Sequence, residues 1–206
     1  MLGLPSTTAV DRRLPKELFY KMLSPSGSVK QSFVEDIEAV VLSHAIRADV
    51  TGVMDGEHVH EVRVVEVRLK ARFVPREALE CMANGFSAKT VFVCTYGEEA
   101  CLAVMLKGLI VGPWRCADGL TLEVNAGSID LVWDSIASQV AYGDAGDGDR
   151  TVEERFAEDA RLKALRDELA RVEARGRKER QFARKNALFD QAKELKRQIA
   201  DIEKGR

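Results

Sequence analysis

Two acidic residues and a lysine come nearest to forming a metal-dependent active site. In restriction-endonuclease-like nucleases, an Asp precedes a strand bearing Glu-x-Lys; the acids hold Mg²⁺ and the lysine polarises water. Asp55 precedes the segment HEVRVVEVRLK, which contains Glu66 and Lys70. The position two residues before Lys70 is Arg68 rather than an acid. The three residues are therefore candidates for a Mg²⁺-dependent nuclease, or for a degenerate nuclease fold without metal.

The densest group of positive charge lies near the C-terminal end. Six basic residues fall within eleven positions together with one acid, Glu179. They are Arg175, Arg177, Lys178, Arg180, Arg184 and Lys185. Such a group can contact nucleic-acid phosphates, and Phe182 lies among them where it can stack or pack. The alternative is the solvated end of a coiled coil, because long charged helices carry many Lys and Arg residues on their surface.

Other motifs with a known chemistry are missing from the sequence. His58 and His60 are spaced to share a metal on a strand, but no third ligand accompanies them, so we interpret them as part of a surface hairpin. The sequence contains no phosphate-binding loop, dinucleotide-binding fingerprint or nucleophile elbow. We therefore expect no bound metal, no cofactor and a protein that binds partners rather than an enzyme.

Charge and cysteine content narrow the class further. Residues 151–206 hold 16 Lys and Arg and 12 Asp and Glu, a net charge of +4, whereas residues 1–150 hold 15 and 21, a net charge of -6. The four cysteines form no C-x-x-C pair, and we expect reduced, buried thiols. The N-terminal residues lack an apolar signal region and no run approaches the length of a membrane span, so we expect a cytoplasmic location.

Residues 1–142 predict an α+β domain with a mixed or antiparallel sheet and flanking helices. Proline, glycine and serine at element ends, together with apolar periodicity, indicate helices near residues 15–24, 29–36, 75–85 and 128–140. Alternating or continuous apolar runs indicate strands near residues 38–46, 60–70, 90–96, 101–106, 109–114 and 120–124.

The strand at residues 60–70 shows a change of phase. Val62 and Val64 alternate with charged residues, and the apolar set then moves to Val65, Val67 and Leu69. Because a strand has a side-chain period of two, this slip predicts a β-bulge in the strand.

The remaining sequence predicts an acidic, glycine-rich linker at residues 143–150 and a helical arm at residues 151–206. Two apolar seams run through this arm, one from Leu162 to Val172 and one from Leu188 to Ile202. The seams are out of phase, so we expect an antiparallel hairpin that bends near Gly176. One continuous helix is the alternative, and it would favour a coiled-coil homodimer because its seam would need a second chain.

The sequence resembles the bacterial family catalogued as Domain of Unknown Function 4391 along nearly its whole length. The segments that carry the resemblance are LGLPSTTAVDRRLPKELFY, HEVRVVEVRLK, TVFVCTY, LTLEVNAGSIDLVWDSIASQV and KERQFARKNALFDQAKELKRQI. The last segment departs from the family pattern, since Ala183 and residues 187–190 replace its usual Asn and Val-Glu-Leu-Asn. The resemblance implies no catalytic residue.

Members of that family are often encoded near helicases and DNA methyltransferases in restriction-like or phage-defence loci. The resemblance therefore implies a helicase or methyltransferase as partner protein. We expect a non-enzymatic accessory subunit of a DNA-processing system, whose α+β domain docks such a partner and whose arm contacts the partner or DNA.

Overall fold

The computed structural model describes residues 2–124, 127–146 and 150–204. The chain divides into two units, Met1–Val152 and Glu153–Arg206, and each is described separately below.

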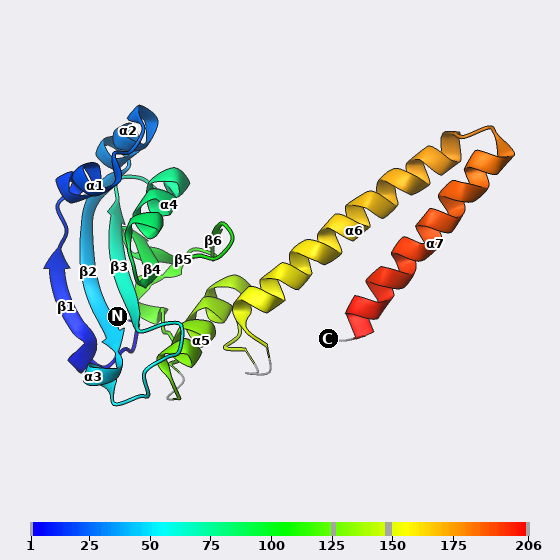
Figure 1. The fold of residues 1–206 in the computed structure, drawn as a ribbon. Helices are drawn as coiled ribbons and strands as arrows, with labels where there is room; N and C mark the ends of the chain where they lie inside the picture. The colour runs from blue at the N-terminus through cyan, green and yellow to red at the C-terminus, as the bar shows by residue number, and fades with distance from the viewer. Residues whose placement is uncertain (1, 125–126, 147–149, 205–206) are drawn as a thin grey trace. The chain divides into compact units, whose positions relative to one another are not determined.

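A mixed sheet forms the centre of the first unit (Figure 1). Its strands are β1 (Ala9–Arg13), β2 (Ile37–Arg47), β3 (Glu61–Leu69), β4 (Lys89–Tyr96), β5 (Glu99–Met105), β6 (Leu109–Val111) and β7 (Arg115–Cys116). The order is β1-β2-β3-β4-β5-β6, and β7 pairs with β5. Only the β3–β4 pair is parallel among these strands; its two members are connected through a helix, whereas the other pairs are antiparallel. The predicted mixed sheet is thus confirmed.

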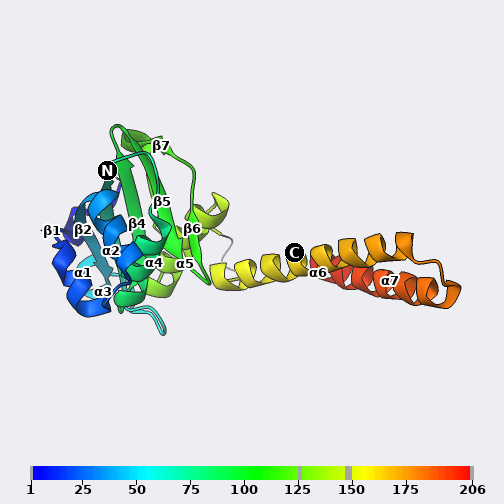
Figure 2. The same cartoon turned by 90° about the horizontal axis from the view of Figure 1, so that it is seen from above.

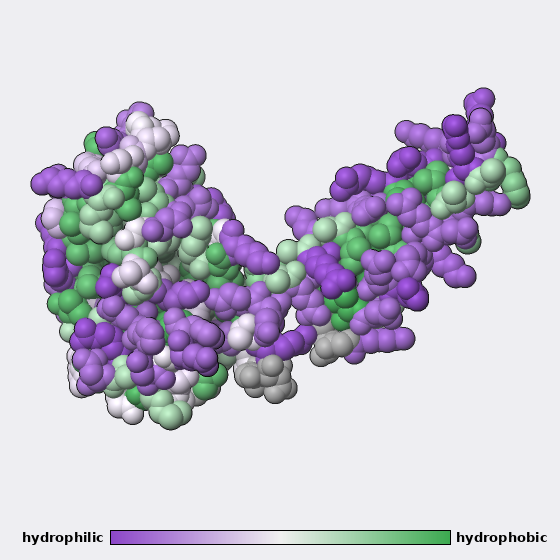
Figure 3. All heavy atoms as spheres, viewed as in Figure 1, coloured by the Kyte–Doolittle hydropathy of each residue, from purple (hydrophilic) through white to green (hydrophobic). Residues whose placement is uncertain are grey.

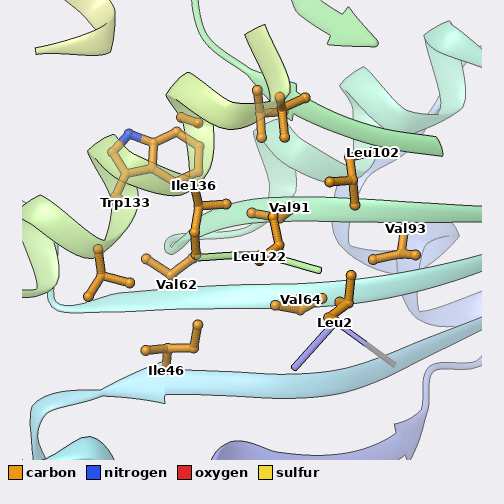
Figure 4. Packing of buried hydrophobic residues seen from close by; sticks show 14 of the residues in the cluster. Leu2, Ile46, Val62, Val64, Val91, Val93, Leu102, Leu122, Trp133 and Ile136 are labelled. Atoms are coloured by element: carbon orange, nitrogen blue, oxygen red, sulfur yellow. The ribbon is translucent and has the colours of Figure 1, made fainter. Parts of the chain in front are cut away.

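Helices cover the two faces of this sheet. The helices of the unit are α1 (Lys16–Leu23), α2 (Gly27–Glu35), the short α3 (Ala48–Thr51), α4 (Arg76–Gly85) and α5 (Ile129–Tyr142). Phe19 of α1, Phe33 of α2 and Leu79 of α4 belong to one core cluster. Trp133 and Ile136 of α5 belong to the other, and Figure 4 shows them beside Val62 of β3.

The two clusters explain the change of phase in β3. Val62 and Val64 are buried in the cluster of α5, whereas Val65, Val67 and Leu69 are buried in the cluster of α1, α2 and α4. Because alternate residues point to opposite faces, a regular strand whose two faces are covered over different lengths gives this pattern. The predicted bulge in β3 is wrong: β3 pairs with β4 in unbroken register, and the irregularities opposite it lie in β2.

Some short elements differ from the sequence-based expectation. Residues 120–124 form no strand; Thr121 makes an isolated parallel bridge to Leu2. The edge strand β1 has no apolar alternation that could reveal it, because all five of its residues are exposed. The thiols of Cys94 and Cys101 are buried as expected, but Cys116 is exposed.

The second unit is an antiparallel helical pair, which confirms the hairpin. Helix α6 (Val152–Lys178) and helix α7 (Phe182–Lys204) lie side by side in both views (Figure 1, Figure 2). Their seam contains buried Val172, Ala192 and Leu195. The chain turns at residues 179–181, so Gly176 lies inside α6 rather than at the bend.

Residues 147–149 of the predicted linker at residues 143–150 lie outside the part of the chain that the structure describes. Gly143 ends α5 with a φ of 82°, a left-handed conformation that glycine adopts without strain. Val152, the last residue of the first unit, is fully buried in the core cluster that contains Trp133 and Ile136. The described helices include none with the length and apolar content needed to cross a membrane.

Candidate functional site

The structure does not bring the three nuclease candidates together. Asp55 lies in the loop before β3, where its carboxylate is 3.1 Å from the ring of His60. Glu66 lies within β3 and accepts a hydrogen bond of 2.8 Å from Arg68. Lys70 follows β3 and donates to the carbonyl oxygen of Val34 at 2.7 Å.

The length of β3 separates Asp55 from Lys70. A strand of nine residues spans roughly 30 Å at 3.3 Å per residue. Glu66 is also engaged by Arg68, the residue that stands where the nuclease pattern has an acid. Within the described part of the chain, no three His, Cys, Asp or Glu side chains are grouped so that they could hold a metal ion.

The two histidines of the loop before β3 line a separate pocket of about 440 Å³. His58 and His60 border it from the loop, and Lys89 and Thr90 border it from the start of β4. The loop itself is held by Asp130 of α5, whose carboxylate accepts backbone N–H groups of residues 57–59 at distances from 2.6 to 3.2 Å. The pocket therefore has walls of mixed polar and apolar character, and the loop on one side is anchored by Asp130.

The six basic residues predicted from the sequence gather at the turn of the helical pair, and all six are exposed. Three end α6, Arg180 lies in the turn, and two lie in the first turn of α7. They do not share one face: Arg175 and Arg177 are about 200° apart around α6 at 100° per residue. The cations therefore point in different directions at the tip of the hairpin and do not form one continuous basic surface.

The turn between the helices is fixed by Glu179. Its carboxylate accepts the backbone N–H groups of Arg180 and Gln181, both at 2.8 Å. The hydrogen bond from Gln181, followed by that from Arg180, lowers the pKa of Glu179. Because those N–H groups would otherwise be unpaired at the start of α7, the glutamate stabilises the reversal of the chain.

A groove of about 610 Å³ lies between α6 and α7 on one side of the pair. Its lining residues are Val172, Glu173, Gly176 and Arg177 from α6, and Lys185, Leu188, Phe189, Ala192, Lys193 and Lys196 from α7. Of this set, the sequence pattern predicted only Arg177 and Lys185 as binding residues. We call this surface the hairpin groove.

The hairpin groove exists because the apolar surface of α7 is wider than its seam. Leu188 and Ala192 pack toward α6, where Gly176 offers no side chain; a Cβ there would lie 3.8 Å from the Cβ of Leu188. Phe189 projects beside this floor and is 70% exposed. Phe182, seven residues earlier on the same side of the helix, is 78% exposed. Figure 3 shows hydrophobic atoms along the junction of the helices with hydrophilic ones around them.

The charges around the hairpin groove are unequal. Four cations and one carboxylate, Glu173, line it, giving a local charge of +3. Lys196 lies 2.7 Å from Glu173, and this hydrogen bond and charge lower the pKa of that carboxyl. Arg177, Lys185 and Lys193 have no ion pair of 4 Å or less with the described residues. A different side of the pair carries a polar contact between Gln191 and Glu168.

These features define an α+β protein with a helical hairpin, whose most distinctive surface is an apolar groove with a basic rim. A family model described as Domain of unknown function (DUF4391) matches residues 2–199, and the chain belongs to that family. No curated protein and no solved structure matches the chain.

Proposed function

We propose that this protein is a non-enzymatic interaction subunit that holds a partner protein through its hairpin groove. The observation that carries the proposal is the apolar surface left over after α6 and α7 have paired. An exposed apolar surface lowers solubility unless a partner covers it, and a large exposed aromatic side chain that lines a recess is typical of an interface anchor. Phe189 is 70% exposed and lines the groove.

The pairing of the arms supports a hetero-interaction more than a coiled-coil homodimer. Val172, Ala192 and Leu195 are buried between α6 and α7 of one chain. The seam therefore needs no second copy for its burial.

For the identity of the partner, we propose a helicase or methyltransferase of a restriction-like or phage-defence system. This part of the proposal is an analogy: the chain belongs to the family, and the resemblance to that family implies such a partner. It assigns to the first unit, residues Met1–Val152, a further contact with the same partner.

Affinity purification from cells that carry the native operon tests the proposal. The tagged full-length chain is compared with Phe189→Ser, which removes the groove anchor, and with Arg184→Glu, a nearby change outside the groove lining. We expect a DNA-processing protein to be recovered with the unmodified chain and Arg184→Glu, and to be lost with Phe189→Ser. Recovery of no such protein, or equal recovery with all three chains, contradicts the proposal.

A second candidate function is nucleic-acid binding by the hairpin tip, and the exposed cations around Phe182 favour it. Neutralised phosphates release counterions, so the affinity must fall steeply as salt rises. Fluorescence anisotropy with labelled single-stranded and duplex oligonucleotides at two salt concentrations measures this. Binding that is insensitive to salt contradicts phosphate recognition.

A further inference from the structure

We infer that the hairpin groove receives one amphipathic α-helix of the partner, with an apolar stripe flanked by Asp and Glu, and that this helix completes a three-helix bundle with α6 and α7. The inference rests on the proposed function and specifies the chemistry of the partner.

The dimensions of the groove suit a helix. On α7 its lining runs from Lys185 to Lys196, a rise of about 16 Å at 1.5 Å per residue, or three helical turns. Two paired helices leave a continuous furrow along their junction, in which a third helix can contact both. An extended peptide that binds by strand addition needs unpaired backbone groups, and the described backbone of α6 and α7 is helical on both sides of the furrow.

The floor of the groove requires an apolar stripe on the incoming helix. Val172, Leu188 and Ala192 form the floor, and the ring of Phe189 forms one wall. A helix that places apolar residues at i, i+3, i+4 and i+7 presents such a stripe. Its side chains would enclose Phe189, the anchor of the interface.

The rim requires negative charge beside that stripe. Arg177 borders the groove from α6, and Lys185 and Lys193 border it from α7, so cations lie on both sides of the groove. Acidic side chains flanking the stripe would meet them in the way that e and g positions pair in coiled coils. Glu173 does not oppose this arrangement, because Lys196 already neutralises it.

The same residues fit a nucleic acid less well. A phosphate chain in the groove would pass the carboxylate of Glu173, and its bases would meet a floor of Val172, Leu188 and Ala192 with Phe189 as the one aromatic ring of the lining. The exposed ring that belongs to the basic tip is Phe182, which does not line the groove. The test must therefore distinguish binding of an oligonucleotide from binding of an acidic helix.

Selection from a displayed library of helical peptides tests the inference even though the partner is unidentified. The peptides have about 18 residues, roughly 27 Å of helix, with randomised surface positions. The immobilised target is the full-length protein, and the counter-target is the Phe189→Ser variant. We expect enriched peptides with an apolar i, i+3, i+4, i+7 stripe and an excess of Asp and Glu beside it. No enrichment over the counter-target, or enrichment of basic peptides, overturns the inference.

Enriched peptides are then measured by anisotropy against matched charge reversals. Lys185→Glu changes a groove residue and Arg184→Glu changes its neighbour in the same first turn of α7, so both alter the helix dipole alike. We expect Lys185→Glu alone to weaken binding about threefold, the effect of one rim ion pair, and Arg184→Glu to change it less than twofold. Adding Lys193→Glu to Lys185→Glu should bring the loss to about tenfold, the effect of two such pairs. Equal effects of the two reversals overturn the inference, and circular dichroism at 222 nm confirms that each variant keeps its hairpin.

The outcomes separate this inference from the proposed function. A cellular partner whose binding requires Phe189, but which contacts the groove through a loop or a basic helix, supports the proposed function and refutes the acidic helix. If single-stranded oligonucleotide displaces the peptide, and Phe182→Ala abolishes oligonucleotide binding, the surface belongs to nucleic acid. That outcome refutes both the acidic helix and the partner-binding function.

Discussion

Removal of the Asp130 carboxylate is expected to release the loop before β3. This side chain lies in the first turn of α5 and accepts the N–H groups of Glu57 at 2.6 Å, His58 at 3.2 Å and Val59 at 2.7 Å. No other contact holds three consecutive backbone groups of that loop among the described residues. Asp130→Ala therefore leaves three donors to be satisfied by water.

The expected loss of unfolding free energy follows from these three hydrogen bonds. A hydrogen bond to a charged group contributes about 1.5–3 kcal/mol when buried. Because Asp130 is partly exposed, each hydrogen bond contributes no more to the free energy of unfolding than an exposed helix cap does. The three bonds together then contribute roughly 2 kcal/mol. With an m-value of about 2 kcal/mol/M, the urea midpoint falls by about 1 M.

Tryptophan fluorescence measures this transition selectively, because both tryptophans, Trp114 and Trp133, belong to the first unit. Unfolding in urea is followed for the unmodified chain, Asp130→Ala and Asp118→Asn. Asp118 is an exposed acid of the same unit and serves as the matched control, with an expected shift near zero. An Asp130→Ala midpoint equal to that of the control refutes the reasoning.

The dependence on pH gives a second criterion. Partial burial raises the pKa of Asp130, but the hydrogen bonds from residues 57–59 outweigh it, so the pKa lies below the ordinary value of 3.8. A depressed pKa in the folded state means that the carboxylate stabilises the fold above pH 3.8 and that this contribution is lost as the pH falls through the folded value. The difference between the unmodified chain and Asp130→Ala should thus be full at pH 7 and shrink below pH 4. A difference that stays constant down to pH 3 contradicts the assignment.

Three further predictions use the same preparations. Gly56→Ala should lower the free energy of unfolding, followed by tryptophan fluorescence, by about 1–3 kcal/mol, because its Cβ would lie 2.2 Å from the carbonyl oxygen of Val59; an unchanged urea midpoint contradicts this close approach. Leu195→Ala should weaken the hairpin by about 2–3 kcal/mol, seen by circular dichroism at 222 nm with the tryptophan transition unmoved. A thiol reagent should label Cys116 at once and Cys94 only upon unfolding, since the former is exposed and the latter buried; equal rates contradict this order.

Much of the fold was predictable because local patterns and tertiary structure agree. Ser128 caps α5 and accepts the N–H of Leu131 as its position before the apolar helix predicts. The strand β4 is buried over five consecutive residues, as its continuous apolar run indicates. The phase change in β3 was misread because one sequence cannot say that two helical layers cover different lengths of the two faces.

The candidate site was less accessible from the sequence. The cluster from Arg175 to Lys185 was visible as composition, but the hairpin groove depends on the register of α6 against α7. Pairing Gly176 with Leu188 creates the opening, and no local pattern fixes that pairing. The signal in the sequence that could have revealed the groove is the seven-residue spacing of Phe182 and Phe189. This spacing places both rings on one side of α7, away from the seam, where both are exposed.

The short turn at residues 179–181 determines how the hairpin can change in evolution. Adding seven residues to each of α6 and α7 would extend the arm by about 10 Å and restore nearly the same facing of the helices. A single inserted residue in α7 before Phe189 would rotate the helix by about 100° relative to the turn and carry the anchor out of the groove. Viable length variants of this arm should therefore differ by paired heptads, and the position of the groove along the arm would move with them.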